Sequence, residues 1–255
     1  MAVVFEERLR PQVLARAGRL VARVATRPDE IEAAQRLRWR VFSEEFGARP
    51  GAAANGLDRD LFDRFCRHLI VEDESIGEVV GTSRVMMPDA AARAGGRYTE
   101  GEFFTDRLRP IRAELVELGR SCVHPDYRTG ATIMLLWSGL GELLAGQPAF
   151  YLIGCASVPL HDGGRYAASL WRQLWARHAA PEHLRVFPKR RLPVEDLAHD
   201  CEVVVPPLIK GYLRAGGMLI GEPFEDVEFG CVDLPMLLTP ERMSARYARR
   251  FVKPV

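Results

Sequence analysis

The 255-residue sequence lacks an apolar run that could cross a membrane, because no window approaches the roughly 18 apolar residues that a span needs. Its N-terminus also lacks the basic, apolar and small-residue order of a secretory signal peptide. No repeat of fixed period and no low-complexity linker is present. We therefore expect a cytoplasmic globular protein, in keeping with 47% apolar and 27% charged residues.

Cysteines are few, odd in number and never in C-x-x-C spacing, which disfavours a disulfide framework and predicts buried, reduced thiols. The five are Cys66, Cys122, Cys155, Cys201 and Cys231. The histidines are dispersed and do not combine with cysteines at zinc spacing, so we expect no metal site. Cys122 and His124 leave a thiol–imidazole pair as a minor alternative.

Three common nucleotide and hydrolase motifs are missing. The chain has no G-x-G-x-x-G, no G-x-x-x-x-G-K-[ST] and no G-x-S-x-G, so dinucleotide, P-loop and nucleophile-elbow chemistry have no support. The net charge of +1 predicts no binding to nucleic acid.

Residues 8–27 hold six arginines and no acid. Leu9, Val13 and Ala17 fall at helical spacing, which predicts a basic amphipathic helix within an extension over residues 1–19, followed by a single domain over 20–255. The helix is either an ordinary solvated surface or a peripheral contact with an anionic membrane or an acidic carrier protein.

Hydrophobic periodicity predicts an α/β fold. Helices are expected from a cap at Thr26 to about Phe46, and over 129–145, 165–178, 207–215 and 241–251. Strands are expected over 20–26, 67–73, 78–87, 113–123, 149–158, 218–220 and 230–238. Residues 88–112 read as irregular. This order predicts a mixed sheet with helices on its faces.

The segment from Val123 to Thr132 has a strand end, a proline turn and a helix start. The N-terminus of a helix offers free N–H groups and a positive dipole end, which suit a phosphate. The alternative is a plain connection between a strand and a helix.

This segment resembles the phosphate-binding turn of the GNAT superfamily of acyltransferases. The resemblance implies a mixed, mostly antiparallel sheet flanked by helices. It also implies a role in binding phosphopantetheine and the reaction's oxyanion for Leu118, Gly119, Cys122, Val123, Arg128, Thr129, Gly130, Ala131 and Thr132. The usual R/Q-x-x-G-x-G/A spacing is not met by Arg128-Thr129-Gly130. That departure favours the single phosphate of acyl carrier protein over coenzyme A as donor, with no tightly bound cofactor.

A second resemblance joins four charged motifs. Arg38-x-x-x-Phe42, Asp60-x-x-Asp63, Gly81-x-x-Arg84 and Glu117-x-x-Arg120 follow the order of acyl-homoserine-lactone synthases. Ala48 stands where those synthases carry a tryptophan, and this chain is longer.

The phrases Val116–Arg128, Leu136-Trp137, Gly154–Ser157 and Pro206–Arg214 are similar to ornithine N-acyltransferases. This resemblance spans about residues 20–251. It implies transfer of a 3-hydroxyacyl group from acyl carrier protein to the α-amine of ornithine, giving lyso-ornithine lipid. The alternatives are an acyl-homoserine-lactone or other N-acyl-amino-acid synthase, or a non-catalytic module that binds a carrier or membrane.

Acyl transfer requires a base for the amine, donors for the oxyanion and a proton for the thiolate. Glu117 lies among apolar strand residues and is the candidate base, with Arg120 beside it. Residues i and i+3 of a regular strand face opposite sides, so we predict a bulge near Leu118–Gly119. The alternative is a structural ion pair of Glu117 and Arg120. The resemblance suggests Tyr212 as the acid for the thiolate.

The remaining charged residues are candidates for binding the amino acid. Asp60 and Asp63 would hold ammonium groups from a helical or looped segment, whereas Arg38, Arg84 and Arg120 would hold a carboxylate. The resemblances add Phe42 and Ser157 to this substrate site. A scaffold network of salt bridges is the alternative.

A dense basic patch follows in a proline-rimmed segment. It consists of Arg185, Lys189, Arg190 and Arg191, with Arg128 and Arg165 as extensions. Such a patch would attract acidic acyl carrier protein, unless it is only a solvated basic loop.

Overall fold

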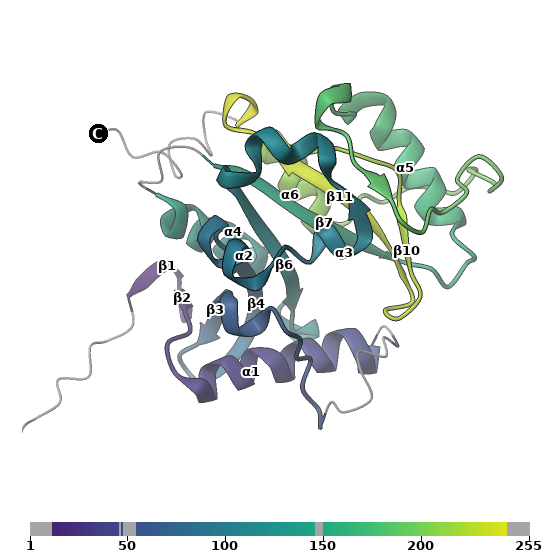
Figure 1. Ribbon diagram of the computed structural model, residues 1–255. Coiled ribbons are helices and arrows are strands. Elements are labelled where there is room, and N and C mark those ends of the chain that lie inside the picture. The colour runs from purple at the N-terminus through teal and green to yellow at the C-terminus, as the bar shows by residue number, and fades with distance from the viewer. Residues whose placement is uncertain (1–11, 46, 48–54, 146–149, 244–255) are drawn as a thin grey trace, which may run out of the picture.

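The computed structural model describes residues 12–45, 47, 55–145 and 150–243. Within them, nine strands form one sheet in the order β1-β2-β3-β4-β6-β7-β11-β10, with β9 paired to β11 (Figure 1). Their bounds are β1 Val13–Ala17, β2 Leu20–Val24, β3 Arg67–Asp73, β4 Glu78–Met86, β6 Leu115–Val123, β7 Tyr151–Pro159, β9 Met218–Leu219, β10 Phe224–Asp226 and β11 Cys231–Leu238. Strands β5 (Phe103–Phe104) and β8 (Phe187–Pro188) form a separate pair.

The α-helices flank this sheet. They are α1 Pro28–Trp39, α2 Pro88–Ala94, α3 Thr99–Glu102, α4 Ala131–Leu144, α5 Arg165–His178 and α6 Pro207–Ala215. A π-helical segment, Arg40–Glu45, extends α1. Short 3₁₀ segments occupy Asp63–Phe65, Asp106–Glu114, Pro125–Tyr127, Glu182–Leu184 and Pro240–Arg242.

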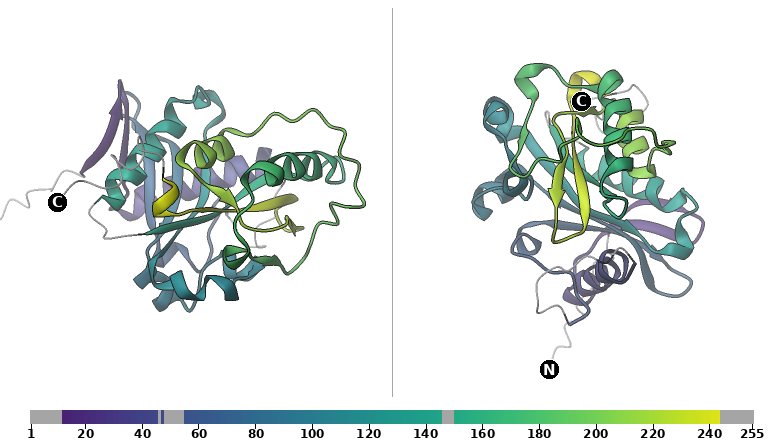
Figure 2. Two further views of the ribbon diagram at one scale, coloured as in Figure 1. Left: turned by 90° about the horizontal axis from the view of Figure 1, so that it is seen from above. Right: turned by 90° about the vertical axis from the view of Figure 1, so that its right-hand side faces the viewer.

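Helices α1 and α4 cover opposite faces of the sheet. Ile70 in β3 packs with Ala34 of α1, whereas its neighbour Leu69 faces Gly139 of α4. Successive side chains of a strand alternate between faces, so β3 is buried on both sides. The segment from β8 to α6 runs around the outside of α5 (Figure 2, left), where Tyr166 donates to the carbonyl of Val204.

The sheet opens between β6 and β7. These two strands pair in parallel through three positions only, the last being Glu117 with Ile153. Strand β6 nevertheless continues to Val123 and β7 to Pro159, and β7 stays paired with β11 along eight positions. The divergence therefore leaves an opening within the sheet rather than at its edge.

The predicted class, a mixed and mostly antiparallel sheet with helices on both faces, is confirmed. The strands over 67–73 and the helices over 165–178 and 207–215 have the predicted bounds. Helix α1 begins after Arg27 rather than Thr26, and Glu30 accepts the backbone N–H groups of both residues.

The predicted basic helix near the N-terminus is wrong from Val13 onward. Val13–Ala17 is an edge strand that pairs with β2 through a two-residue turn. Gly18 in that turn has a φ of 58°, the left-handed conformation that hairpin turns require. Gly18 is the residue in the sequence that indicates a hairpin turn instead of a helix at this point. Residues 8–11 lie outside the described part of the chain.

Residues 88–112 are not irregular. Helix α2 begins with Pro88 and is closed by Gly95 at a φ of 81°, which are ordinary start and stop signals. Strands β5, β8 and β10 were also not predicted, and each has only two or three residues. Of the predicted C-terminal helix 241–251, residues 241–242 belong to a 3₁₀ turn and 244–251 lie outside the described residues.

Candidate active site

The opening between β6 and β7 leads into a cavity of about 670 Å³. Its walls come from β4, β6, β7, β10, β11, α6 and the start of α4. The predicted site residues that line it are Phe42, Arg84, Glu117, Leu118, Gly119, Arg120, Cys122, Val123, Arg128, Thr129, Gly130, Ser157 and Tyr212. Segments far apart in the sequence thus converge on one space.

Phe42 reaches the cavity from the π-helical segment. An α-helix adds one residue per 100°, and the wider π turn re-aims the side chains that follow it. The Phe42 ring meets Phe229 edge-on, with centroids 6.2 Å apart. The predicted continuation of helix α1 is therefore correct in extent up to Glu45 but not in type.

Glu117 is 5% exposed and lines the cavity. Its Oε2 accepts the backbone N–H of Tyr98 at 3.0 Å, and its Oε1 accepts the N–H and hydroxyl of Thr99 at 2.8 and 2.5 Å. An ionised carboxylate has about four lone-pair sites, so one remains for a ligand. The three donors fix the orientation of the group.

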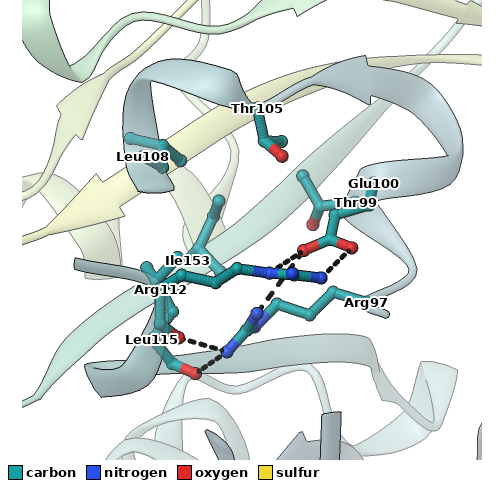
Figure 3. A pocket seen from close by; sticks show the side chains of 8 residues that line it. All are labelled: Arg97, Thr99, Glu100, Thr105, Leu108, Arg112, Leu115 and Ile153. Atoms are coloured by element: carbon teal, nitrogen blue, oxygen red, sulfur yellow. Dashed lines mark hydrogen bonds and ion pairs between the residues drawn. The ribbon is translucent and has the colours of Figure 1, made fainter. Parts of the chain in front are cut away.

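The loop that donates to Glu117 is itself anchored to β6. Figure 3 shows the guanidinium of Arg97 donating to the carbonyls of Leu115 and Arg112, at 2.7 and 2.9 Å. Arg112 in turn binds Glu100. These contacts close a small pocket of about 10 Å³ and hold Tyr98 and Thr99 against Glu117.

Strand β6 contains the predicted bulge, displaced along the chain. Pairing with β4 is regular from Glu117 to Gly119 and resumes at Cys122, so the extra residue lies at Arg120–Ser121 and not at Leu118–Gly119. Arg120 has a φ of 50°, a left-handed conformation uncommon outside glycine. Glu117 and Arg120 both line the cavity, as the bulge requires.

Arg120 does not pair with Glu117 among the described residues, so the alternative of a Glu117–Arg120 ion pair is wrong. Its guanidinium carbon lies 4.6 Å from the ring centroids of both Tyr98 and Phe229. Asp58 lies 3.3 Å from its Nε. Stacking and the ion pair together hold a strained backbone position.

Three arginines and three aspartates form one network beside the cavity. Arg38 binds Asp58 and Asp63 at 2.6 and 2.7 Å. Arg84 binds Asp60 at 2.6 Å and Asp63 at 3.3 Å, and Arg120 lies 3.4 Å from Asp60. The charges are equal in number, which stabilises the buried groups against desolvation.

This network changes the expected roles of Asp60 and Asp63. Asp63 begins a 3₁₀ turn and Asp60 lies just before it, as the looped segment predicts. Their carboxylates already bind arginines, and neither lines the cavity, nor does the fully buried Arg38. They are therefore scaffold groups that aim Arg84 and Arg120. Asp58 was missed because no motif marks it.

Tyr212 lies at the opening between the strands. It is 1% exposed, and its ring packs edge-on against Trp137 with centroids 5.1 Å apart. Burial, reinforced by Cys155 and Glu117, raises the pKa of Tyr212. The hydroxyl of Tyr212 therefore stays protonated at neutral pH.

The start of α4 forms the far end of the cavity. Gly130 is the N-cap at a φ of 88°, and an added Cβ there would meet open space. Arg128 and Thr129 line the same end. Thr132 does not: it is fully buried, and its Cγ2 would lie 2.6 Å from a Cβ on Gly81. Ala131 is exposed but also lies off the cavity.

The expected basic surfaces are partly neutralised. Arg191 binds Glu195 and Glu222, and Arg185 packs over Trp175. Within the described ranges, Lys189 and Arg190 form no ion pair and are exposed. Near the N-terminus, Arg16, Arg19 and Arg23 bind Glu74, Asp73 and Glu72.

Two further acids line the cavity and were not predicted. Asp226 and Asp233 come from β10 and β11, and Ser157 donates to Asp233 at 2.6 Å. An acid in the otherwise apolar strand Cys231–Leu238 was the available signal.

Comparison with known proteins gives the family. A model of the acetyltransferase (GNAT) domain matches residues 37–138. The L-ornithine N(alpha)-acyltransferase of Brucella abortus is 36% identical over 94% of each chain. That of Rhizobium meliloti is also 36% identical, over 95% of this chain and 90% of its own. This chain belongs to the L-ornithine N(alpha)-acyltransferase family. It is an acyltransferase, as the sequence motifs indicated.

Solved structures with a similar fold are more distant from this family member. The acyl-homoserine-lactone synthase LasI is 13% identical over 88% of this chain and 92% of its own, with a TM-score of 0.48. FeeM, an N-acyl amino acid synthase from uncultured soil microbes, is 16% identical over 87% and 91%, with a TM-score of 0.45. Among the described residues, no helix is both long and apolar enough to cross a membrane.

Proposed function

We propose that this acyltransferase moves a 3-hydroxy fatty acyl group from acyl carrier protein to the α-amine of ornithine, which yields lyso-ornithine lipid. The family's printed names support ornithine as acceptor. The observation that carries the proposal is that Glu117 and Tyr212 line one cavity at the opening between β6 and β7. A base and an acid thus lie where two substrates can meet.

The donor would enter along the diverging strands. Beyond Glu117 the inner edge of β6 is not paired with β7, so its backbone groups are available to the amides of a pantetheine arm. The phosphate would bind the free N–H groups at Gly130 and the start of α4. One such helix end suits the single phosphate of a carrier-bound arm, with coenzyme A as the poorer donor.

In the reaction, Glu117 takes a proton from the α-ammonium of the acceptor. The amine then attacks the thioester carbonyl, and backbone N–H groups of β6 stabilise the oxyanion. When the intermediate collapses, the C–S bond breaks and the C–N bond remains. The departing thiolate takes the proton of Tyr212, and the nitrogen gives its second proton to the Tyr212 oxygen, so one amide and one thiol are formed and the Tyr212 hydroxyl is restored.

Arg84 and Arg120 are the groups proposed to bind the α-carboxylate of the acceptor. Both line the cavity, and both are held by the aspartate network. A planar guanidinium that is already oriented loses little conformational freedom when it binds a carboxylate.

Docking of the acidic carrier protein is assigned to the predicted patch, chiefly Lys189 and Arg190. Charge reversal of Arg190 to Glu should raise the KM for acyl carrier protein and weaken its dependence on salt. Arg191→Glu is a poor test because it would break two ion pairs. Contact with an anionic membrane rests on residues 1–11, which the structure does not describe.

A panel of amino acids tests the proposed reaction, each incubated with 3-hydroxyacyl carrier protein or acyl-coenzyme A and followed by mass spectrometry. Acyl-ornithine formed faster from the carrier protein is the expected result. Faster turnover with acyl-coenzyme A would contradict the proposed donor. A product with other amines but not with ornithine would contradict the proposed acceptor.

A further inference from the structure

Acidic side chains gather in the wall formed by β10 and β11. Asp226 and Asp233 line the cavity but are only 8% and 4% exposed. Each has one oxygen bound: Ser157 donates to Oδ1 of Asp233, and the backbone N–H of Phe229 donates to Oδ1 of Asp226. An ionised carboxylate has about four lone-pair sites, so these bonds leave part of the accepting capacity of each group unused.

Glu102 of α3 adds a third carboxyl group beside Asp233, although its side chain does not line the cavity. It is 5% exposed, and its Oε2 accepts the thiol of Cys155 at 3.3 Å. Its Oε1 is buried and has no hydrogen-bond partner in the described part of the chain. The adjacent group is the carboxyl of Asp233, which lies within hydrogen-bonding range. Two carboxylates at this distance require a proton or a cation between them.

The local charge is not balanced by protein cations. Arg120 is the cation that acts on Asp233, but it is already bound by Asp58 and Asp60. Burial and the neighbouring Asp233 raise the pKa of Glu102, and burial raises the pKa of Asp233 to about 6. A bound cation would relieve both effects.

This acidic cluster lies two side chains away from Glu117. Thr99 donates to Glu117 at 2.5 Å and lies 3.9 Å from the thiol of Cys155, which contacts Glu102. The two nitrogen atoms of ornithine are five bonds apart, on the order of 6 Å when the chain is extended with bonds of about 1.5 Å. One ligand can therefore reach both places.

We propose that Asp226 and Asp233, with Glu102 beside Asp233, bind the side-chain ammonium group of a diamino acid, and so select ornithine over amino acids without a second amine. The inference rests on the proposed function, because Glu117 must receive the α-amine of the same molecule. The oxygens of the two cavity-lining carboxylates are acceptors for the three donors of an ammonium group.

A metal ion is the competing occupant. Asp226, Cys231 and Asp233 place one ligand atom each within 4.8 Å of one another. Burial raises the pKa of the Cys231 thiol, with Asp233 adding to the effect, which opposes the thiolate that a metal prefers. The ammonium is favoured because it requires only acceptor oxygens, which Asp226 and Asp233 supply, and no thiolate.

Kinetics with L-ornithine and L-norvaline test the inference, because norvaline has the same carbon chain without the terminal amine. Wild type should favour ornithine in kcat/KM by about tenfold or more, the range for a hydrogen bond to a charged group. Asp233→Asn and Asp226→Asn should lower kcat/KM for ornithine by about 10- to 100-fold, mainly through KM, and change norvaline less than about threefold. The exposed Asp196→Asn is the matched control and should change neither substrate.

Equal losses for both substrates in Asp233→Asn, or no preference in wild type, would overturn the ammonium site and leave the proposed function intact. A wild type that forms no acyl-ornithine would instead overturn the proposed function. If a variant does not fold, thermal denaturation of the wild-type protein tests the ammonium site instead. Ornithine should then raise the Tm of wild type more than norvaline does. Inactivation of wild type by EDTA with recovery on adding zinc would overturn the ammonium in favour of a metal.

Discussion

Tyr212 and Gly154 are packed so closely that a Cβ on the glycine would lie 2.4 Å from the tyrosine hydroxyl. The same Cβ would lie 2.5 Å from the carbonyl oxygen of Leu118. Gly154 follows Ile153, the last residue of β7 that pairs with β6. The absent side chain therefore lets the hydroxyl and the β6 backbone share the point where the strands separate.

Gly154→Ala should lower kcat strongly, by about 100-fold, because the methyl group must displace Tyr212 or widen the strands, and small misplacements of reacting groups are costly. Overpacking should also cost about 1–3 kcal/mol of stability. Steady-state kinetics and urea unfolding measure the two effects. Gly101→Ala is the control, since a Cβ at Gly101 meets nothing within 4 Å. Full activity in Gly154→Ala would mean that the position of the hydroxyl does not matter.

Tyr212→Phe should reduce kcat by about 10- to 100-fold while leaving KM for both substrates nearly unchanged, since only the proton donor is removed. The ring keeps its contact with Trp137, so Tm should change little. An acyl donor with a more acidic thiol depends less on protonation of the leaving thiolate. It should therefore reduce the difference in kcat between wild type and Tyr212→Phe. If Tyr212→Phe lowers kcat by the same factor with both donors, Tyr212 has a structural role and is not the proton donor.

Glu117→Gln should lower kcat by about 100-fold or more, which is the range for loss of a general base. The variant should still bind acyl carrier protein, as measured by calorimetry, because Glu117 is only 5% exposed and offers little surface to a protein partner. In the variant, at least one of the three groups that donate to Glu117 will face an amide N–H instead of an oxygen. The folded fraction of the variant must therefore be measured. Wild-type turnover in this variant would show that Glu117 is not the base.

Asp63 should make the protein sensitive to acid. Against the effect of burial, Arg38 and Arg84 lower the pKa of Asp63 to about 2 from its ordinary 3.8. A lowered carboxyl pKa stabilises the fold above the ordinary value and ceases to do so as the pH falls through 3.8 toward 2, which amounts to about 2 kcal/mol. Urea unfolding between pH 7 and pH 2 measures this loss.

Asp63→Asn removes that pH dependence and should destabilise the protein at pH 7 by about 3–5 kcal/mol, because two buried arginines lose a carboxylate. Asp89→Asn is the matched control: it breaks an exposed pair with Arg93 and should cost under about 1 kcal/mol. Equal costs for the two variants would contradict the structural role of the network.

The sequence predicted that β6 contains a bulge but placed the bulge at the wrong residues. Glu117 and Arg120 at i and i+3 required a break in regular pairing, and a bulge is present. Its position was wrong because Gly119 looked like the permissive residue. Arg120 adopts the left-handed conformation instead, held by ring contacts with Tyr98 and Phe229 that come from distant segments.

Contacts between residues that are far apart in the sequence were the main feature that the sequence could not predict. Asp60 and Asp63 were expected to face the substrate, yet the three arginines that occupy the network lie on α1, β4 and β6. No local sequence pattern predicts these ion pairs between distant segments. Helices with strong periodicity, such as Arg165–His178, needed no tertiary information.

The hairpin of β10 and β11 carries the two aspartates of the proposed ammonium site. Asp226 and Asp233 both lie on it, downstream of the region that matches the GNAT domain model, whereas Glu117 and Arg120 lie within that region. Residues 224–233 are therefore exchangeable as one cassette when Phe229, which stacks on Arg120 of β6, is retained. Transplanting this cassette between family members would redirect the choice of amine while leaving the acyl donor unchanged.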